Sequence, residues 1–360
     1  MPENNPIQVD EILRKAIQLN ASDIHFSFDT PPISRVAGVL SPVSGFGALN
    51  EDDLKSIVIQ LLPEEKIELL YKDREIDCAY ELTTKERFRV NIFFEKDKLA
   101  FALRLIPPHI PTLDESSIPH IYYEFCKLPA GLVIVAGPSG VGKSTTLAAM
   151  INWINQNRNT HIVTIEDPIE YLFKSDKSLI QQRELHLDTK SWEKSLKSAL
   201  REDADVIFVG EVRDFETLNL TLKAAETGHL VFTTIHAFSA SQTIERIIGM
   251  YPENKQAQAR MQLSVVLEGI FTQTLVSGID KSKRYPAVEI LIATDAVKNT
   301  IREGNSHFID NIINTSIETG MQSLERSLAD LVNQGRVTLE VAMASSRKPD
   351  EVVRFVKRRK

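Results

Sequence analysis

The sequence predicts an α/β protein made of a small N-terminal α+β domain and a larger domain with a mainly parallel sheet. In the second half of the chain, nearly unbroken apolar runs alternate with helical periodicity, as in strands buried on both faces and joined by helices. Three prolines within residues 107–111 can continue neither a helix nor a central strand. We therefore expect one domain over residues 1–106, a linker over 107–117 and a second domain over 118–360.

The elements of the first domain follow from periodicity and turn residues. Apolar positions at helical spacing predict helices over residues 7–19 and 54–70. Alternation with a period of two predicts strands, which we place at residues 21–26, 33–40, 87–94 and 99–106, the last two forming a hairpin.

The second domain is expected to contain strands joined by helices. Short apolar runs place these strands at residues 131–136, 162–165, 206–209, 230–232 and 287–292. Helical patterns fill the intervals between them and continue to the end of the chain.

Length, charge and cysteine usage narrow the functional classes. The 360 residues suggest about two domains, and the net charge of −7 argues against a surface devoted to nucleic acid. Cys78 and Cys126 lack neighbours at metal-ligand spacing and are expected to be free thiols in a reducing cytoplasm. Residues 1–5 do not resemble a signal peptide, and no apolar run approaches the roughly 18 residues that span a bilayer. We expect a cytoplasmic chain without direct membrane insertion.

A glycine-rich loop after residues 131–136 matches G-x-x-x-x-G-K-[ST], the pattern of a loop that binds ATP and Mg²⁺. Its glycines let backbone N–H groups point at phosphate oxygens, and the helix that begins near Lys143 adds its positive end. Lys143 can reach the β- and γ-phosphates, and the Ser144 hydroxyl can ligate Mg²⁺. The expected nucleotide-binding residues are Gly137, Pro138, Ser139, Gly140, Val141, Gly142, Lys143, Ser144 and Thr145.

Two further predicted strands end in carboxylates. In an open α/β sheet the ligand lies beyond the carboxyl ends of the strands, so Glu166, Asp167 and Glu211 are expected near the γ-phosphate. We expect Glu211 to activate the attacking water, and Glu166 or Asp167 to help position Mg²⁺. A helix cap or a surface ion pair is the alternative role for each of these acids.

Two histidines, His229 and His236, flank the apolar run at residues 230–235. A histidine at the end of a buried strand can sense the γ-phosphate as a hydrogen-bond donor. A purely structural histidine is the alternative for each.

Several motifs together resemble the type IV pilus retraction ATPases, the PilT family of the secretion ATPase superfamily. The resemblance extends from about residue 8 to residue 345. Residues 164–170 are similar to the family's Asp box, residues 210–214 to its Walker B motif and residues 227–236 to its His box. Ser264, Leu267 and Gln273 are expected on a helix typical of the family.

This resemblance implies a PAS-like N-terminal domain, a RecA-like ATPase domain and a homohexameric ring. ATP would lie between the two domains, and Arg87, Arg89 and Arg104 match arginines that reach its phosphates. From composition alone these arginines would be surface charges. His229 would link the nucleotide state to the neighbouring strand. The implied partner is an inner-membrane platform protein at the cytoplasmic face of the membrane, and a paralogous pilus ATPase is a second candidate partner.

The resemblance favours a retraction motor that drives pilin disassembly and twitching motility. The chain lacks the four-cysteine zinc motif of extension ATPases. Residues 296–303 are similar to the family's retraction motif but depart from it at Val297, Lys298 and Thr300. An accessory retraction motor or a related secretion ATPase is therefore an alternative. A RecA-like nucleic-acid translocase also fits the loop and sheet, although a basic groove studded with aromatic residues is not visible.

Overall fold

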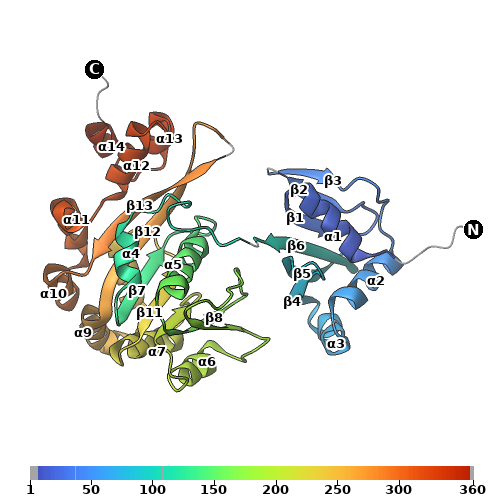
Figure 1. Ribbon diagram of the computed structural model, residues 1–360, viewed down its shortest axis with the longest axis horizontal. Coiled ribbons are helices and arrows are strands. Elements are labelled where there is room, and N and C mark those ends of the chain that lie inside the picture. Colours follow the sequence, from blue (N-terminus) through green and yellow to red (C-terminus); the bar gives the residue numbers. More distant parts are fainter. Residues whose placement is uncertain (1–6, 37, 108, 282, 357–360) are drawn as a thin grey trace, which may run out of the picture. The chain divides into compact units, whose positions relative to one another are not determined.

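The computed structural model describes residues 7–36, 38–107, 109–281 and 283–356. These form two compact units, Met1–His109 and Ile110–Lys360 (Figure 1). Residues 1–6 and Pro108 of the expected linker lie outside the described residues. Within the described ranges, no helix is both long and apolar enough to cross a bilayer.

The first unit is an antiparallel sheet of order β3-β2-β1-β6-β5-β4, packed against three helices. Each pair of neighbouring strands is antiparallel. The elements are α1 (Val9–Gln18), β1 (Ala21–Phe26), β2 (Ile33–Val36), β3 (Val39–Pro42), α2 (Glu51–Leu61), α3 (Glu64–Asp73), β4 (Glu75–Glu81), β5 (Arg87–Glu95) and β6 (Lys98–Ile106).

Two expected elements of the first unit are each divided in the structure. The strand expected at residues 33–40 is the hairpin β2–β3. The helix expected at residues 54–70 is two helices, because Pro63 has an extended backbone and starts α3 after α2 has ended. The α2 helix starts earlier than expected, since the Asn50 side chain accepts hydrogen bonds from the N–H groups of Asp52 and Asp53. The strand β4 was not anticipated.

The second unit contains a seven-stranded sheet of order β13-β12-β7-β11-β10-β8-β9, in which β12 and β13 pair antiparallel and the other described pairs of neighbouring strands are parallel. The strands are β7 (Gly131–Ala136), β8 (His161–Glu166), β9 (Leu179–Glu184), β10 (Val206–Val209), β11 (Leu230–Ile235), β12 (Leu267–Ser277) and β13 (Arg284–Ile292). The helices are α4 (Ile121–Cys126), α5 (Lys143–Asn157), α6 (Trp192–Ala199), α7 (Phe215–Glu226), α8 (Ala240–Gly249), α9 (Gln256–Val266), α10 (Asp295–Glu303), α11 (Ile309–Thr315), α12 (Leu324–Asn333), α13 (Leu339–Ala344) and α14 (Pro349–Phe355). The predicted α/β fold class, an α+β unit followed by a mainly parallel α/β unit, is confirmed.

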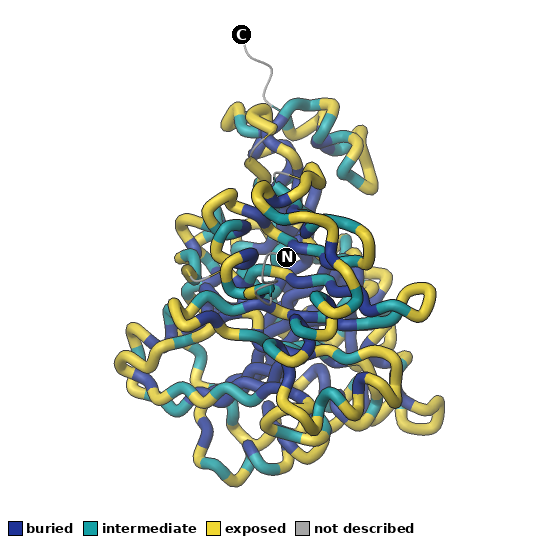
Figure 2. Tube along the Cα trace, turned by 90° about the vertical axis from the view of Figure 1, so that its right-hand side faces the viewer, coloured by how far each residue is buried: buried dark blue, intermediate teal, exposed yellow. Residues whose placement is uncertain are grey.

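The parallel sheet is buried on both faces, as the apolar runs predict. Every residue of β7, β10 and β11 is buried, and in Figure 2 buried residues gather in the interior while exposed ones lie on the outside. Side chains of β7 alternate between two cores: Leu132 and Ile134 face the layer of α6 to α9, whereas Val133 and Val135 face α4 and α5. Helices on both faces make this sheet a rigid base for the loops at its edge.

One sequence-based placement is wrong. Ser264, Leu267 and Gln273 do not share a helix, because α9 ends at Val266 and Leu267 begins β12. Ser264 lies in α9, and Gln273 lies in the middle of the strand. β-Branched and aromatic residues are frequent after Leu267, and pairing with both β7 and β13 stabilises the extended form.

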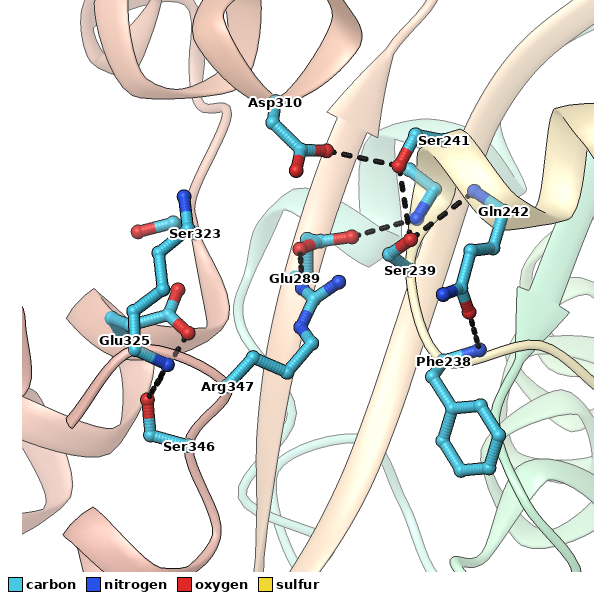
Figure 3. A network of polar contacts seen from close by, with 12 residues as sticks. Phe238, Ser239, Ser241, Gln242, Glu289, Asp310, Ser323, Glu325, Ser346 and Arg347 are labelled. Atoms are coloured by element: carbon cyan, nitrogen blue, oxygen red, sulfur yellow. Dashed lines mark hydrogen bonds and ion pairs between the residues drawn. The ribbon is translucent and has the colours of Figure 1, made fainter. Parts of the chain in front are cut away.

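The C-terminal helices α12 to α14 pack on β12 and β13 through an apolar cluster and are held by a polar network (Figure 3). Glu289 of β13 is 3% exposed, forms an ion pair with Arg347, and accepts a 2.7 Å hydrogen bond from the N–H of Ala240. Burial raises the pKa of Glu289, although Arg347 opposes the shift. Asp310 accepts a 3.0 Å hydrogen bond from the Ser241 hydroxyl. Two carboxylates therefore accept hydrogen bonds from the first turn of α8 and hold it in place.

The packing of β12 against α4 generates a stability prediction at Gly269. A Cβ added there would lie 2.5 Å from Cε1 of Phe125 and 3.2 Å from the carbonyl oxygen of Leu291. We expect Gly269→Ala to lower the free energy of unfolding by about 1–3 kcal/mol, as overpacking does. Gly249→Ala is the control, since a Cβ at Gly249 meets no atom within 4 Å. Equal urea midpoints for the two variants would contradict the prediction.

Candidate nucleotide-binding site

The loop between β7 and α5 has the backbone of a phosphate-binding cradle. Gly137, Gly140 and Gly142 have φ angles of 149°, 77° and 89°, which other residues rarely adopt. Gly142 is the N-cap of α5, so the first N–H groups of that helix and its positive end face the loop. Ser144 and Thr145 lie in the first turn of α5. The expected phosphate-binding residues are thus brought together around one concave backbone.

The Lys143 ammonium lies at the centre of this cradle. Its Nζ donates hydrogen bonds to the carbonyl oxygens of Gly137 at 3.0 Å and Pro138 at 2.8 Å. Burial lowers the pKa of Lys143, while the charges of Glu211 and Glu170 oppose the shift. A residue that is 8% exposed and places a positive charge within a glycine-rich loop at a helix N-terminus is suited to an anion.

Glu211 stands beside the loop in a hydrogen-bonded group with His236 and Arg213. Its Oε1 lies 2.9 Å from Nε2 of His236, and its Oε2 accepts a 2.7 Å hydrogen bond from Arg213. Burial opposes ionisation, but Arg213, His236 and Lys143 together hold the pKa of Glu211 below its usual value. Burial and the Lys143 charge lower the pKa of His236 despite Glu211. At neutral pH the pair is therefore a carboxylate and a neutral imidazole whose Nε2 carries the proton.

Glu166 faces inward from the end of β8. Its Oε1 accepts hydrogen bonds from the Thr164 hydroxyl at 2.7 Å and from Nε2 of Gln182 at 3.1 Å. Burial raises the pKa of Glu166 to about 7. Asp167, the next residue, is exposed. Of the two acids expected near the metal, Asp167 is therefore the more accessible.

The segment that follows β8 lies next to the loop. The Tyr171 hydroxyl lies 2.9 Å from Oγ1 of Thr145. The exposed Glu170 is near enough to affect the pKa of Lys143. The Asp box therefore borders the phosphate cradle.

Gln273 contacts the phosphate loop directly, a role that the motifs of the sequence do not predict. It is 3% exposed in β12, its Oε1 accepts a 2.9 Å hydrogen bond from Thr146, and its Nε2 donates one of 2.8 Å to the carbonyl oxygen of Val141. In the sequence, Gln273 stands within a stretch of apolar and β-branched residues. A glutamine in such a stretch indicates a buried amide with specific hydrogen-bond partners.

The two histidines lie at opposite ends of β11. Leu230 pairs with Gly131 and Ile235 with Ala136, so His236 adjoins the phosphate loop whereas His229 lies at the amino end of the sheet. Six strand residues span about 20 Å. His229 Nδ1 is 2.9 Å from the carbonyl oxygen of Ala224. Within one chain, the parallel strand therefore carries His229 away from the phosphate loop, and the role expected for His229 at the γ-phosphate stays a prediction.

The three candidate arginines lie in the first unit on neighbouring strands. Arg35, Asp23, Arg104 and Arg89 are successive cross-strand partners and so share one face of the sheet. Nε of Arg104 donates a 2.9 Å hydrogen bond to Asp23. Burial opposes the shift, but hydrogen bonds from Ser22 and Arg104 hold the pKa of Asp23 below its usual value. Arg87 begins β5, two residues before Arg89 and on the same face.

Comparisons with known proteins agree on one family. Residues 115–354 match the type II/IV secretion system protein family. The chain is 42% identical over 326 residues to a twitching motility protein of Neisseria gonorrhoeae, covering 91% of this chain and 87% of that protein. It is 38% identical to the type IV pilus retraction ATPase PilT of Pseudomonas aeruginosa, covering 96% and 99% of the two chains. A crystal structure of the pilus retraction motor PilT with bound ADP superposes with a TM-score of 0.90 at 41% identity, covering 97% and 99%.

The buried Glu166 generates a prediction about pH. The pKa of Glu166 is about 7 in the folded protein against an ordinary value of 4.5 for a glutamate, so the unfolded chain binds fewer protons between these two pH values. Stability contributed by the protonated group is present below about pH 4.5 and is lost as the pH rises to about 7. At about 1.4 kcal/mol per pKa unit the loss is roughly 3 kcal/mol.

We therefore expect the stability of Glu166→Gln relative to the unchanged protein to rise between pH 5 and pH 7 and to level off above pH 7. Urea midpoints measured across this range test the expectation. A pH-independent difference for Glu166→Gln would contradict the assignment.

Proposed function

Because the chain belongs to the type II/IV secretion system protein family and, within it, to the type IV pilus retraction ATPases, we propose that it hydrolyses ATP to drive pilin disassembly from a type IV pilus. The observation that carries the proposal is the cradle with Lys143 at its centre and an ionised Glu211 beside it. A nucleotide-binding switch does not need a carboxylate held ionised at this position. Glu211 therefore favours turnover over simple nucleotide binding.

The oxygen donors around the cradle fit Mg²⁺, which prefers oxygen ligands and keeps several waters. Ser144 would hold the ion directly, and Asp167 would hold it directly or through water. When bound, Mg²⁺ would neutralise charge on the β- and γ-phosphates. Asp167 is exposed at the end of β8, whereas the hydrogen bonds of Glu166 direct its carboxyl inward. We therefore assign Asp167, in preference to Glu166, to the metal.

Hydrolysis forms a bond from the water oxygen to the γ-phosphorus and breaks the bond to the β–γ bridging oxygen. Glu211 accepts a hydrogen bond from that water and orients it. Because the pKa of Glu211 is held low, the carboxylate is a weak base, and orientation is the larger part of its role. His236 donates through Nε2 to Glu211 and so fixes the direction of the carboxylate. The water's proton leaves with the phosphate product.

The remaining parts of the proposal follow from the resemblance of the sequence motifs to the family. Six chains would form a ring, and Arg87, Arg89 and Arg104 would supply positive charge to the phosphates. An inner-membrane platform protein would receive the motion at the cytoplasmic face of the membrane, and a paralogous pilus ATPase would be a second partner. His229, which lies far from the loop of its own chain, would link the nucleotide state to a neighbouring strand.

An accessory retraction motor is the second candidate function. The residue Lys298, which departs from the family's retraction motif, lies in α10 with Nζ 3.5 Å from Oε1 of Glu268. A lysine at this position keeps the charge but lacks the planar fork of arginine. A changed motif on this helix would suit a paralogue that works beside a principal motor.

Three measurements test the proposal together: the ATPase rate of the purified protein, its mass in solution, and the effect of single-stranded DNA on the rate. We expect a hexamer whose hydrolysis ignores DNA. Loss of pilus retraction in cells lacking the gene would identify the principal motor, and retained but weakened retraction the accessory one. Strong stimulation by DNA would replace the proposal with a nucleic-acid translocase.

The proposed role of Glu211 generates a kinetic prediction. We expect Glu211→Gln to lower kcat by at least about tenfold to a hundredfold, because the amide lacks the charge that orients water. Affinity for ADP should change little. Glu216→Gln, an exposed acid in the first turn of α7, is the matched control and should stay within about twofold. A kcat near that of the unchanged protein would remove Glu211 from the mechanism.

A further inference from the structure

The side chain of Gln273 is buried inside the phosphate loop with both of its polar atoms engaged. Its Oε1 accepts a 2.9 Å hydrogen bond from the Thr146 hydroxyl, and its Nε2 donates a 2.8 Å hydrogen bond to the carbonyl oxygen of Val141. Val141 belongs to the loop and Thr146 to the first turn of α5. One amide therefore bridges the two parts of the cradle from a strand that belongs to neither.

The glycines of the loop are closely fitted to Gln273. A Cβ at Gly137 would lie 2.5 Å from the backbone oxygen of Gln273, and a Cβ at Gly142 would lie 3.2 Å from its Nε2. The loop is thus closed around this residue on both sides. Because Gly137 and Gly142 have no side chain, β12 can lie close to the loop, and a phosphate can approach its backbone as well.

The strand that carries Gln273 is itself firmly placed. β12 pairs with β7 on one side and with β13 on the other, so Gln273 is held from the strand that precedes the loop and from the edge of the sheet. A side chain fixed in this way can hold a glycine-rich loop in one conformation. Pre-ordering of the binding atoms lowers the entropy lost when a ligand binds.

We propose that Gln273 is a positioning residue for nucleotide binding, which sets the affinity for the nucleotide's diphosphate by holding the loop and the start of α5 in their binding geometry. The inference rests on the proposed nucleotide site and deepens it. Gln273 acts through Val141 and Thr146 on the N–H groups of the loop. It takes no part in the chemical step, which lies with Glu211 and its neighbours.

The adjacent residue supplies a matched control. Thr272 is 3% exposed in the same strand, but successive strand residues face opposite sides of the sheet. Among the described residues, its hydroxyl is buried without a hydrogen-bond partner. Thr272→Val therefore removes a buried hydroxyl from β12 without removing a hydrogen bond to the loop. Gln273→Met keeps an unbranched side chain of similar volume and removes both hydrogen bonds to the loop.

The experiment measures the dissociation constant for ADP by titration calorimetry in the full-length protein. We expect Gln273→Met to raise this constant about tenfold and Thr146→Val, which removes one of the two hydrogen bonds, about threefold. Thr272→Val should match the unchanged protein. The double variant Gln273→Met with Thr146→Val should bind no more weakly than Gln273→Met alone, since both changes remove the same contact.

The kinetic readout separates positioning from general stability. With saturating ATP, kcat of Gln273→Met should stay within about twofold of the unchanged protein while KM rises with the dissociation constant. A thermal midpoint that falls with an unchanged dissociation constant would overturn the inference, as would a fall in kcat alone. If Gln273→Met does not fold, the inference is tested by comparing the dissociation constants for ADP of Thr146→Val and Thr272→Val. An unchanged protein that fails to bind ADP would instead overturn the proposed function.

Discussion

Parallel pairing of β7 with β11, and of β11 with β10, places the chemistry of this protein at one edge of its sheet. The three strands run in the same direction, so the segments that leave them emerge together. The loop with Lys143 follows β7, His236 follows β11 and Glu211 follows β10. The parallel strands therefore bring together residues that are dispersed over about a hundred residues of the sequence.

Once gathered, the charges of the site determine one another's protonation. Lys143 and Arg213 keep Glu211 ionised, while burial and Lys143 keep His236 neutral. A carboxylate that can only accept then fixes the imidazole tautomer beside it. Burial alone would have raised the pKa of Glu211, as it does for Glu166 on the neighbouring strand β8. The two acids resemble each other in sequence and differ in role because of their neighbours.

The sequence allowed the fold class and the phosphate loop to be predicted, because both have local signatures: apolar runs of strand length and a motif between strand and helix. It did not distinguish the environments of His229 and His236, since only strand direction separates them. The boundary between α9 and β12 was misplaced because pairing with β7 and β13 determines it. The inward direction of Glu166 likewise depends on Gln182, which comes from the unanticipated edge strand β9.

The ion pair that attaches the C-terminal helices to the sheet affects how this chain can be engineered. Glu289 is buried in the catalytic unit, and its cationic partner, Arg347, lies in the last fifteen residues of the 360. A truncation before Arg347 would leave a carboxylate enclosed without its counter-charge, next to the helix that leads from His236. The C-terminal helices therefore belong to the body of the enzyme. Affinity tags and reporter fusions are better appended beyond α14 than substituted for it.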